Sequence, residues 1–272
     1  MDVTLKDSFG RKIEYLRISV TDKCNFRCRY CMPAEGIELK PRDQILSFED
    51  ITRIVRAAAR LGIWKIRLTG GEPMVRRDIE VLVGMISEVP GVRELSMTTN
   101  GSLLTPERAA ELKEAGLDRV NISIDTISPE RFREITGVGE LEPVLAGADA
   151  AAEAGLLPVK INMVITENSS REEVEEMKKY CNEKGFILQT IKEFSLYSRE
   201  EELPFSFDRP QPCDRCNKLR LTADGFFKPC LFSDLEIPVD MDDIEKSIIE
   251  AVRKKPLRGT ACYNRSMRQI GG

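Results

Sequence analysis

The chain has 272 residues and a formal net charge of −4, and 42% of its residues are hydrophobic and 32% are charged. This balance is typical of a soluble globular protein of about one domain and excludes an intrinsically disordered chain. The mild acidity argues against nucleic acid as a partner, and the sequence shows neither ~18 consecutive apolar residues nor a signal peptide, so we expect a cytoplasmic protein with no membrane partner.

Six short segments rich in β-branched residues are each followed by an amphipathic segment with helical periodicity. The expected strands are residues 15–21, 64–69, 94–100, 119–125, 158–165 and 187–194. Ser47 is expected to cap a helix that ends at Gly62, and Thr105 with Pro106 is expected to open a helix that ends at Gly116. Ser169 and Glu172 are expected to form the capping box of a helix that ends at Gly185. This alternation predicts an α/β fold with a parallel sheet, either an open barrel or a doubly wound sheet.

Four of these strands alternate between apolar and polar residues. Parallel strands that are buried on both faces are normally apolar throughout, so we expect the polar face to line a hollow interior. Arg17, Arg67 and Lys160 lie on that face, where cations cannot be buried without partners. Internal ion pairs or an edge strand are the alternatives, but the repetition in four strands favours a polar cavity that suits an anionic ligand.

The repeating pattern ends after Phe194. Residues 195–213 are charged and rich in proline, which is typical of a boundary between units. We therefore expect a barrel unit over residues 1–194 and a C-terminal segment over residues 195–272, with a helix around residues 240–254.

The chain has eight cysteines and no histidine, which excludes mechanisms that need an imidazole base or ligand. Cys24, Cys28 and Cys31 form a C-x3-C-x2-C loop directly after the first strand, where α/β folds keep their active sites. Three thiolates suit an iron–sulfur cluster, and on a four-iron cube they leave one iron open to an external ligand. The alternatives are three incidental cysteines or a zinc site completed by a distant cysteine.

This loop, with Tyr30 before its last cysteine, resembles the signature of the radical S-adenosylmethionine (radical SAM) superfamily. Gly70-Gly71-Glu72-Pro73 resembles the glycine-rich segment that binds the methionine part of SAM in that superfamily, and glycine there lets the backbone approach a ligand closely. The resemblance implies a partial (β/α)6 barrel of TIM type. It also implies that one electron from the cluster cleaves SAM to give a 5′-deoxyadenosyl radical that abstracts a hydrogen atom.

A second cysteine cluster, Cys213, Cys216 and Cys230, has the spacing C-x2-C-x13-C. By itself this pattern fits an incomplete zinc ribbon or a second three-thiolate iron–sulfur cluster. Residues 17–26, 31–36, 217–232 and the tail 265–272, which ends in two glycines, are similar to the GTP 3′,8-cyclase family, the molybdenum cofactor biosynthesis protein A type. The resemblance covers nearly the whole chain.

This resemblance implies two [4Fe-4S] clusters, SAM as a cofactor and GTP as the substrate. The first cysteine triplet would serve radical formation, and the second triplet, in a C-terminal extension, would hold guanine through its open iron. The positions that match SAM contacts are Tyr30, Gly71 and Ser123, and those that match GTP contacts are Arg17, Arg67, Thr99, Lys160, Lys218, Leu219 and Arg220.

The implied product is (8S)-3′,8-cyclo-7,8-dihydroguanosine 5′-triphosphate, in the first step of molybdenum cofactor biosynthesis. The implied partners are a flavodoxin- or ferredoxin-like electron donor and a downstream cyclic pyranopterin monophosphate synthase, and a homodimer is compatible with the family.

The chain departs from the family's pattern at three places. Only residues 195–212 separate the sixth strand from Cys213, where members carry a longer stretch. Lys218 replaces the first arginine of an Arg-x-Arg pair and keeps the charge without the bidentate fork, and Ser195 stands where members carry a methionine. Cys181 and Cys262 are expected to be packing residues.

Two other functions compete with the cyclase. A radical SAM enzyme that acts on a peptide or another small molecule, with an auxiliary second cluster, would carry more cysteines near its C-terminus. A non-catalytic metal module that binds nucleic acid fits poorly with the acidic balance and with only 6% aromatic residues.

Overall fold

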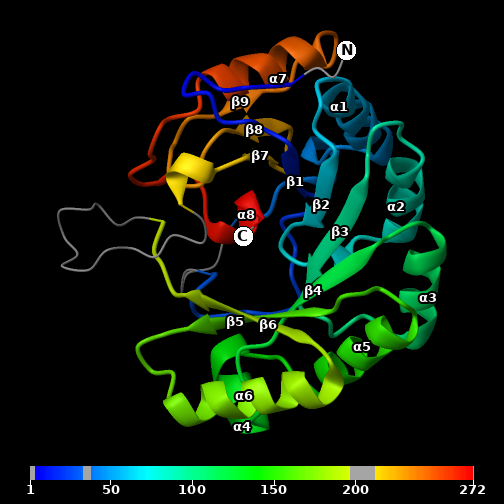
Figure 1. Ribbon diagram of the computed structural model, residues 1–272, viewed down its shortest axis with the longest axis vertical. Helices are drawn as coiled ribbons and strands as arrows, with labels where there is room; N and C mark the ends of the chain where they lie inside the picture. Colours follow the sequence, from blue (N-terminus) through cyan, green and yellow to red (C-terminus); the bar gives the residue numbers. More distant parts are fainter. Residues whose placement is uncertain (1–3, 33–37, 197–211, 272) are drawn as a thin grey trace.

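The computed structural model describes residues 4–32, 38–196 and 212–271, and its strands form a single nine-stranded sheet with the order β6-β5-β4-β3-β2-β1-β7-β8-β9. Figure 1 shows that this sheet is strongly curved, with the C-terminus on its inner side. The first six strands are parallel and stand in sequence order: β1 (Tyr15–Ser19), β2 (Lys65–Thr69), β3 (Glu94–Thr99), β4 (Arg119–Ser123), β5 (Lys160–Ile165) and β6 (Ile187–Lys192). A doubly wound sheet would reverse its order, so the expected partial barrel is confirmed.

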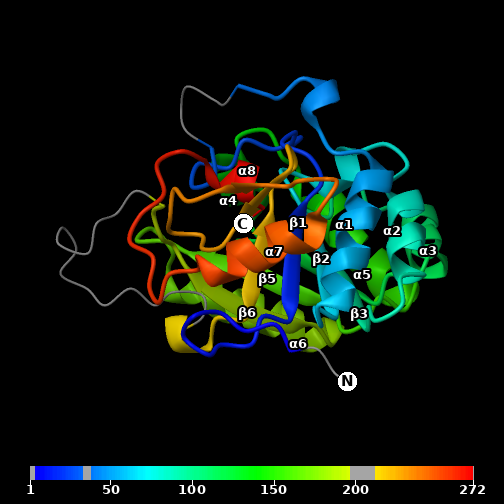
Figure 2. The ribbon, with the colours of Figure 1, turned by 90° about the horizontal axis from the view of Figure 1, so that it is seen from above.

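Six helices cover the outer face of the parallel strands, as Figures 1 and 2 show. They are α1 (Phe48–Arg60), α2 (Ile79–Ser87), α3 (Pro106–Glu114), α4 (Pro129–Thr136), α5 (Leu141–Glu153) and α6 (Arg171–Lys184). The outward strand residues Leu16, Ile18, Ile66 and Leu68 are fully buried in the hydrophobic core beneath these helices. The alternation in the sequence therefore separates a dry outer layer from the inner face.

The helix caps follow the sequence signals with one correction. Ser47 and Thr105 cap α1 and α3 through the backbone N–H groups three residues on. The capping box of α6 consists of Ser170 and Glu173 rather than Ser169 and Glu172. The Ser169 hydroxyl instead accepts from the Thr166 N–H at 3.0 Å, which fixes the turn before the helix.

The C-terminal part extends the same sheet. It consists of β7 (Lys218–Leu221), β8 (Phe226–Lys228), β9 (Ile237–Pro238), the outer helix α7 (Ile244–Arg253) and the short helix α8 (Met267–Ile270). β7 pairs in parallel with β1, and β8 and β9 continue antiparallel. Figure 1 shows α8 at the centre of the barrel, beside the label of the C-terminus. Within the described ranges, short 3-10 helices span Arg42–Gln44, Pro73–Val75 and Cys213–Arg215.

Several features named from the sequence fall outside the described residues. They are the part of the family-like opening at residues 33–36, most of the proline-rich stretch 195–212 and the last glycine of the tail. None of the helices in the described ranges has the length and apolar character needed to span a membrane.

Candidate active site

The first cysteine triplet lies in the loop that follows β1. The N–H groups of Arg27 and Arg29 donate to carbonyls at the end of α4 at 2.9 and 3.0 Å, and the Cys31 N–H donates to the Cys28 carbonyl at 3.0 Å. These bonds fold the loop back on itself so that the thiols influence one another. Burial raises the pKa of Cys31 to about 11, and the neighbouring Cys24 adds to the rise. The three thiols therefore lie near enough to influence one another's pKa.

The buried carboxylate of Asp125 flanks this loop. The Tyr30 hydroxyl donates to the Asp125 carboxylate at 2.8 Å, and the Val164 N–H donates to the other oxygen of Asp125 at 2.8 Å. Burial raises the pKa of Asp125 to about 6. The pKa of Cys28 is raised well above its usual range, first by burial and then by the charges of Cys31 and Asp125. Tyr30 thus ties the cysteine loop to the ends of β4 and β5.

The glycine pair after β2 packs backbone against backbone on the start of the same loop. The Gly71 N–H donates to the Thr21 carbonyl and the Glu72 N–H to the Lys23 carbonyl, both at 2.8 Å. A Cβ atom on Gly71 would lie 2.2 Å from the Lys23 carbonyl oxygen, which no side chain can accommodate. Glycine is therefore required here to bring the two loops together.

The carboxylate of Glu72 is buried and receives three hydrogen bonds. The donors are the Thr99 hydroxyl at 2.6 Å, the Asn100 N–H at 2.6 Å and the Met74 N–H at 2.9 Å. Burial raises the pKa of Glu72 to about 7, although these bonds oppose the rise. Glu72 therefore joins the end of β2 to the end of β3.

Thr99, one of the positions expected to contact GTP, lies at the end of β3, where its side chain bonds to the protein. Its hydroxyl donates to Glu72 and accepts from the Gly101 N–H at 3.1 Å. Its neighbour Thr98 shares the inner face of β3 with Ser96, which pairs with Arg67 in register, and the Thr98 hydroxyl is buried without a hydrogen-bond partner. Strand alternation in residues 94–100 is the signal that identifies Thr98 as the inward residue.

A band of cations lines the inner face of the central strands. Arg17 stands in register with Arg67 on one side and Arg220 on the other, and each of these arginines is only 8% exposed. Burial and the neighbouring positive charges lower the pKa of Lys218 to about 7 and that of Arg220 to about 9. So many buried like charges favour an anionic ligand.

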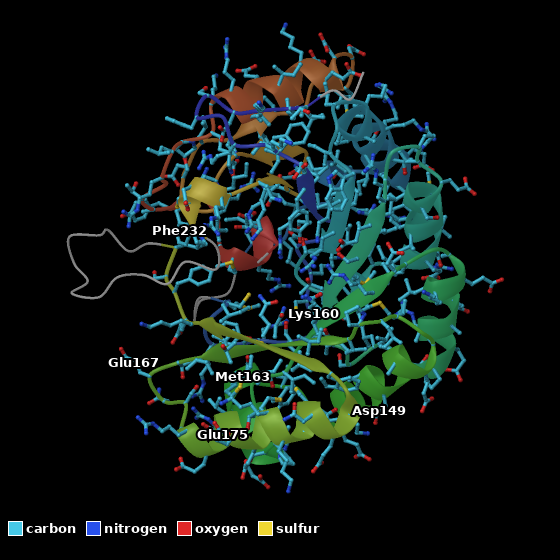
Figure 3. The ribbon with its side chains drawn as sticks, in the orientation of Figure 1. Asp149, Lys160, Met163, Glu167, Glu175 and Phe232 are labelled. Carbon is cyan, nitrogen blue, oxygen red and sulfur yellow. The ribbon has the colours of Figure 1, made fainter. Side chains whose placement is uncertain are left out.

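Lys160 extends this band onto β5, where Figure 3 shows it facing the interior. Burial lowers the pKa of Lys160, and Arg119 and Arg67 lower it further. Arg119 was not singled out from the sequence, although it continues the polar alternation of Asn121 and Ser123 in the expected strand 119–125. It forms a salt bridge with Glu94, which also pairs with Lys65 at 2.9 Å.

Two further predicted contacts occupy opposite faces of the sheet. Ser123 is half-buried at the end of β4, in register with Asn162, and shares the inner face with Asn121 and Arg119. The side chain of Leu219 is fully buried in the hydrophobic core. Leu219 can therefore meet a nucleotide only through its backbone.

The second cysteine triplet lies beside the cation band. Cys213 and Cys216 are joined by a turn in which the Cys216 N–H donates to the Cys213 carbonyl at 3.3 Å. Cys230 follows β8, and a Cβ on Gly259 would lie 2.6 Å from its Sγ. Both Cys216 and Cys230 lie close enough to Arg220 to influence its pKa. The cations of β7 thus stand next to the thiols.

The tail helix α8 connects the two triplets. Arg268 contacts the Met32 sulfur at 3.6 Å, and its charge opposes the rise in pKa that burial imposes on Cys24 and Cys31. At the other end of α8, the Gly271 carbonyl accepts from Arg220 at 2.9 Å and from Arg17 at 3.4 Å. One short helix therefore reaches from the first triplet to the arginines beside the second.

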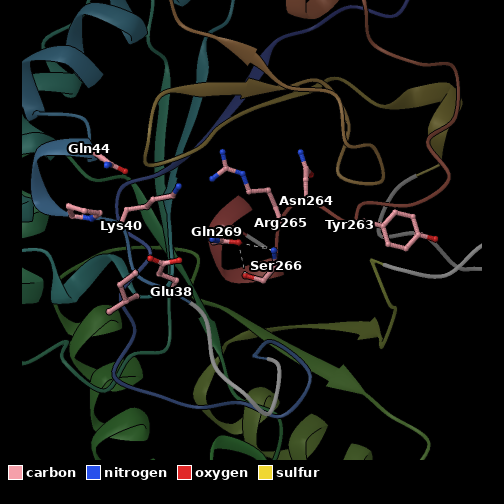
Figure 4. A pocket seen from close by; sticks show the side chains of 10 residues that line it. Glu38, Lys40, Gln44, Tyr263, Asn264, Arg265, Ser266 and Gln269 are labelled. Carbon is pink, nitrogen blue, oxygen red and sulfur yellow. Dashed lines mark hydrogen bonds between the residues drawn. The ribbon is translucent and has the colours of Figure 1, made fainter.

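A pocket of about 430 Å³ opens along one side of this tail helix. Figure 4 shows it between residues 38–44 and 263–269, with Ser266 and Gln269 joined by hydrogen bonds at the start of α8. A Cβ on Gly271, which has a φ of +72°, would lie 2.1 Å from the Thr69 hydroxyl. This glycine lets the tail pass against the inner face of β2.

Within residues 4–32, 38–196 and 212–271, no three Cys, Asp or Glu side chains converge tightly enough to hold a single metal ion. Cys181 and Cys262 are fully buried, and both pack among apolar residues as expected.

The comparisons with known proteins agree with this arrangement. The sequence pattern of the radical SAM superfamily matches residues 18–181. The chain is 38% identical to GTP 3′,8-cyclase of Alkaliphilus oremlandii (strain OhILAs) and 36% identical to GTP 3′,8-cyclase of Thermodesulfovibrio yellowstonii, each across 98% of this chain and 100% of the relative. The first alignment spans 321 positions, so that relative has residues that this shorter chain lacks.

The fold is similar to that of Streptococcus suis SuiB, solved with bound S-adenosylmethionine. The TM-score is 0.69 with 19% sequence identity, over 92% of this chain and 66% of that chain. At this identity the likeness extends to the fold alone.

Proposed function

Because the chain belongs to the radical SAM superfamily and, within it, to the GTP 3′,8-cyclase family, we propose that it converts GTP to (8S)-3′,8-cyclo-7,8-dihydroguanosine 5′-triphosphate. This reaction would be the first step of molybdenum cofactor biosynthesis. The observation that carries the proposal is the band of buried cations between the two cysteine triplets, which offers a triphosphate several arginine and lysine donors in one interior.

The residues at the first triplet fit a [4Fe-4S] cluster with SAM. Three neighbouring thiols offer three ligands, and the glycine pair provides a backbone surface that a ligand can approach closely. When bound, SAM and the reduced cluster would supply the radical chemistry that takes the hydrogen atom from the ribose C3′, and after this carbon joins guanine C8 one further electron and a proton would be needed to complete the dihydro product. The contacts proposed for SAM are Tyr30, Gly71 and Ser123.

The chain's own side chains hold the substrate in this scheme. Arg17, Arg67 and Lys160 bind the triphosphate from the inner strand face. Lys218 and Arg220 hold the nucleotide next to the second triplet, Cys213, Cys216 and Cys230, where the guanine would meet a second [4Fe-4S] cluster. The Gly271 carbonyl orients the Arg220 fork, and the tail helix keeps water out of the interior.

We propose a flavodoxin- or ferredoxin-like electron donor, a cyclic pyranopterin monophosphate synthase that takes the product, a cytoplasmic location and a homodimer. We also propose that residues 1–194 form the SAM-binding unit and residues 195–272 the unit with the second cluster.

The test is anaerobic reconstitution with iron and sulfide, followed by incubation with SAM, dithionite and GTP. We expect 5′-deoxyadenosine to form together with a cyclised guanosine triphosphate, and the Cys28→Ala variant to form neither. Cys181→Ala is the matched control, because Cys181 lies in α6 within the core, and it should keep the activity. Slow 5′-deoxyadenosine formation that GTP does not stimulate would point instead to a radical SAM enzyme for another substrate.

A further inference from the structure

Two buried cations form hydrogen bonds with backbone carbonyls in the segments that carry the second cysteine triplet. The first is Arg11, which is 9% exposed. Its guanidinium donates to the Cys213 carbonyl at 2.6 Å, to the Pro256 carbonyl at 2.6 Å and to the Leu257 carbonyl at 2.9 Å, while its Nε binds Asp7 at 2.6 Å. Arg11 thus links the backbone of Cys213, the first cysteine of the triplet, to the segment after α7.

The second cation is Lys255, which is 3% exposed. Its Nζ donates to the Lys218 carbonyl at 2.8 Å and to the Pro229 carbonyl. Pro229 directly precedes Cys230, and Lys218 lies two residues after Cys216. A single ammonium group therefore joins the segments that carry the other two ligands.

Arg11 binds the backbone directly after Lys255, so the positions of the two cations depend on each other. Lys255 immediately precedes Pro256 and Leu257, whose carbonyls Arg11 holds. Arg11 and Lys255, which are far apart in the sequence, therefore connect three segments around the thiols. These segments are the loop 213–216, the end of β8 and the segment after α7. None of these contacts needs a bound metal.

The charge of Lys255 has no carboxylate partner within the described part of the chain, where its hydrogen-bond acceptors are backbone carbonyls and the Cys216 thiol. A buried ammonium needs a compensating negative charge. Arg11, by contrast, is paired with Asp7. Thiolates that carry an iron–sulfur cluster would supply the missing negative charge.

We propose that Lys255 and Arg11 are positioning residues for the second cluster, and that the charge of Lys255 also raises the reduction potential of that cluster. This inference rests on the proposed second cluster. A positive charge close to a cluster favours the state with one more electron. Arg11 acts through geometry alone, because Asp7 neutralises it.

The experiment compares Lys255→Met and Lys255→Arg with Lys228→Met. Lys228 is a fully buried lysine at the end of β8, but it binds Glu236 and Asn264 at 3.3 and 3.1 Å instead of carbonyls beside the cysteines. After anaerobic reconstitution, we measure iron and sulfide per chain, the electron paramagnetic resonance spectrum of each cluster and its reduction potential. SAM cleavage without GTP reports on the first cluster.

We expect about eight irons per chain in the wild type and in Lys228→Met, and about four in Lys255→Met with SAM cleavage retained. Any second cluster left in Lys255→Met should have a more negative potential, and Lys255→Arg should restore both iron and potential. Full iron with an unchanged potential in Lys255→Met would overturn the inference. A wild-type chain with about four irons, which Cys213→Ala does not lower, would instead overturn the second cluster itself.

Arg11→Lys keeps the test decisive if Lys255→Met fails to fold. This variant keeps the charge but cannot reach three carbonyls at once. We expect it to lose iron from the second cluster while the first cluster keeps its spectrum. Equal loss of both clusters in Arg11→Lys and Lys255→Met would contradict a positioning role.

Discussion

The two cysteine triplets lie in different electrostatic surroundings, although Arg268 also stands beside the first. Next to the first are the buried carboxylates of Asp125 and Glu72, and the pKa of Cys28 is raised by burial and by neighbouring negative charge. Next to the second are Lys255, Lys218 and Arg220. Burial raises the pKa of Cys216, but Lys255 and the Lys218 N–H outweigh burial, so that the pKa of this thiol lies below its usual value.

This difference matches the charges of the two proposed ligands. SAM carries a sulfonium and an ammonium group against one carboxylate, so negative surroundings suit it. GTP carries a triphosphate, so positive surroundings suit it. The comparison teaches that similar sets of three thiols can be given different tasks by the side chains around them.

The largest effect should come from removing ligands of one triplet at a time. Cys28→Ala should abolish all SAM cleavage, because no radical can form. Cys213→Ala should abolish GTP cyclisation and keep the slow SAM cleavage that does not depend on GTP. Chromatography of 5′-deoxyadenosine and of the guanosine product measures both. Identical losses in the two variants would mean that the triplets do not have separate tasks.

The acidic surroundings of the first triplet should appear in the pH dependence of stability. Glu72 ionises near pH 4.5 in the unfolded chain, but burial raises its pKa to about 7 in the fold. As pH rises from 4.5 to 7, the unfolded chain loses its proton first, so the free energy of unfolding should fall by about 3 kcal/mol.

Glu72→Gln should lack this fall, since an amide does not titrate. Urea unfolding of the metal-free chain between pH 4 and 8 gives the difference between the two curves. A wild-type chain that gains stability relative to Glu72→Gln over this interval would show that the carboxylate is ionised at lower pH in the fold.

The basic region should respond to the loss of one arginine. Arg17→Ala removes charge-assisted bonds worth about 2–3 kcal/mol, so the GTP requirement should rise about 30- to 150-fold. SAM cleavage without GTP should stay nearly unchanged, because Arg17 lies apart from the cysteine loop on the inner face of β1. Steady-state kinetics with varied GTP measures the effect. A parallel decline of both activities would assign Arg17 to the fold.

The smallest effect should distinguish the adjacent threonines of β3. Thr98→Val should raise the KM for GTP about fivefold through the loss of one inward hydroxyl, with little change in stability. Thr99→Val should lower the free energy of unfolding by about 1–3 kcal/mol, because Glu72 loses a buried donor. Kinetics and urea unfolding of both variants provide the comparison. The reverse pattern would place Thr99 in the interior.

The sequence predicts the barrel well because strand alternation and helix caps are local signals. The capping box of α6 is wrong by one residue, because Ser169 and Ser170 each have a glutamate three residues on. Long-range packing selects one of these two equal local choices. Thr98 and Thr99 present opposite faces of β3, and the role of Thr99 as a GTP contact stays a prediction.

The contacts that complete the site could not be found in this way. Arg268 reaches Met32, and Arg11 reaches the Cys213 carbonyl, across more than two hundred residues of sequence in each case. Lys255 binds backbone carbonyl groups, and because every residue has one, the sequence does not indicate which carbonyls it binds. Cations that bind backbone become visible only when the fold brings the segments together.

The most direct test of the division between the triplets uses two variants that each keep one of them. In the first, Cys213, Cys216 and Cys230 are replaced by alanine, and in the second, Cys24, Cys28 and Cys31 are replaced. After reconstitution and reduction, SAM should change the electron paramagnetic resonance spectrum of the first variant only, and GTP that of the second variant only. Both variants responding to the same ligand, or neither responding to any, would contradict the account.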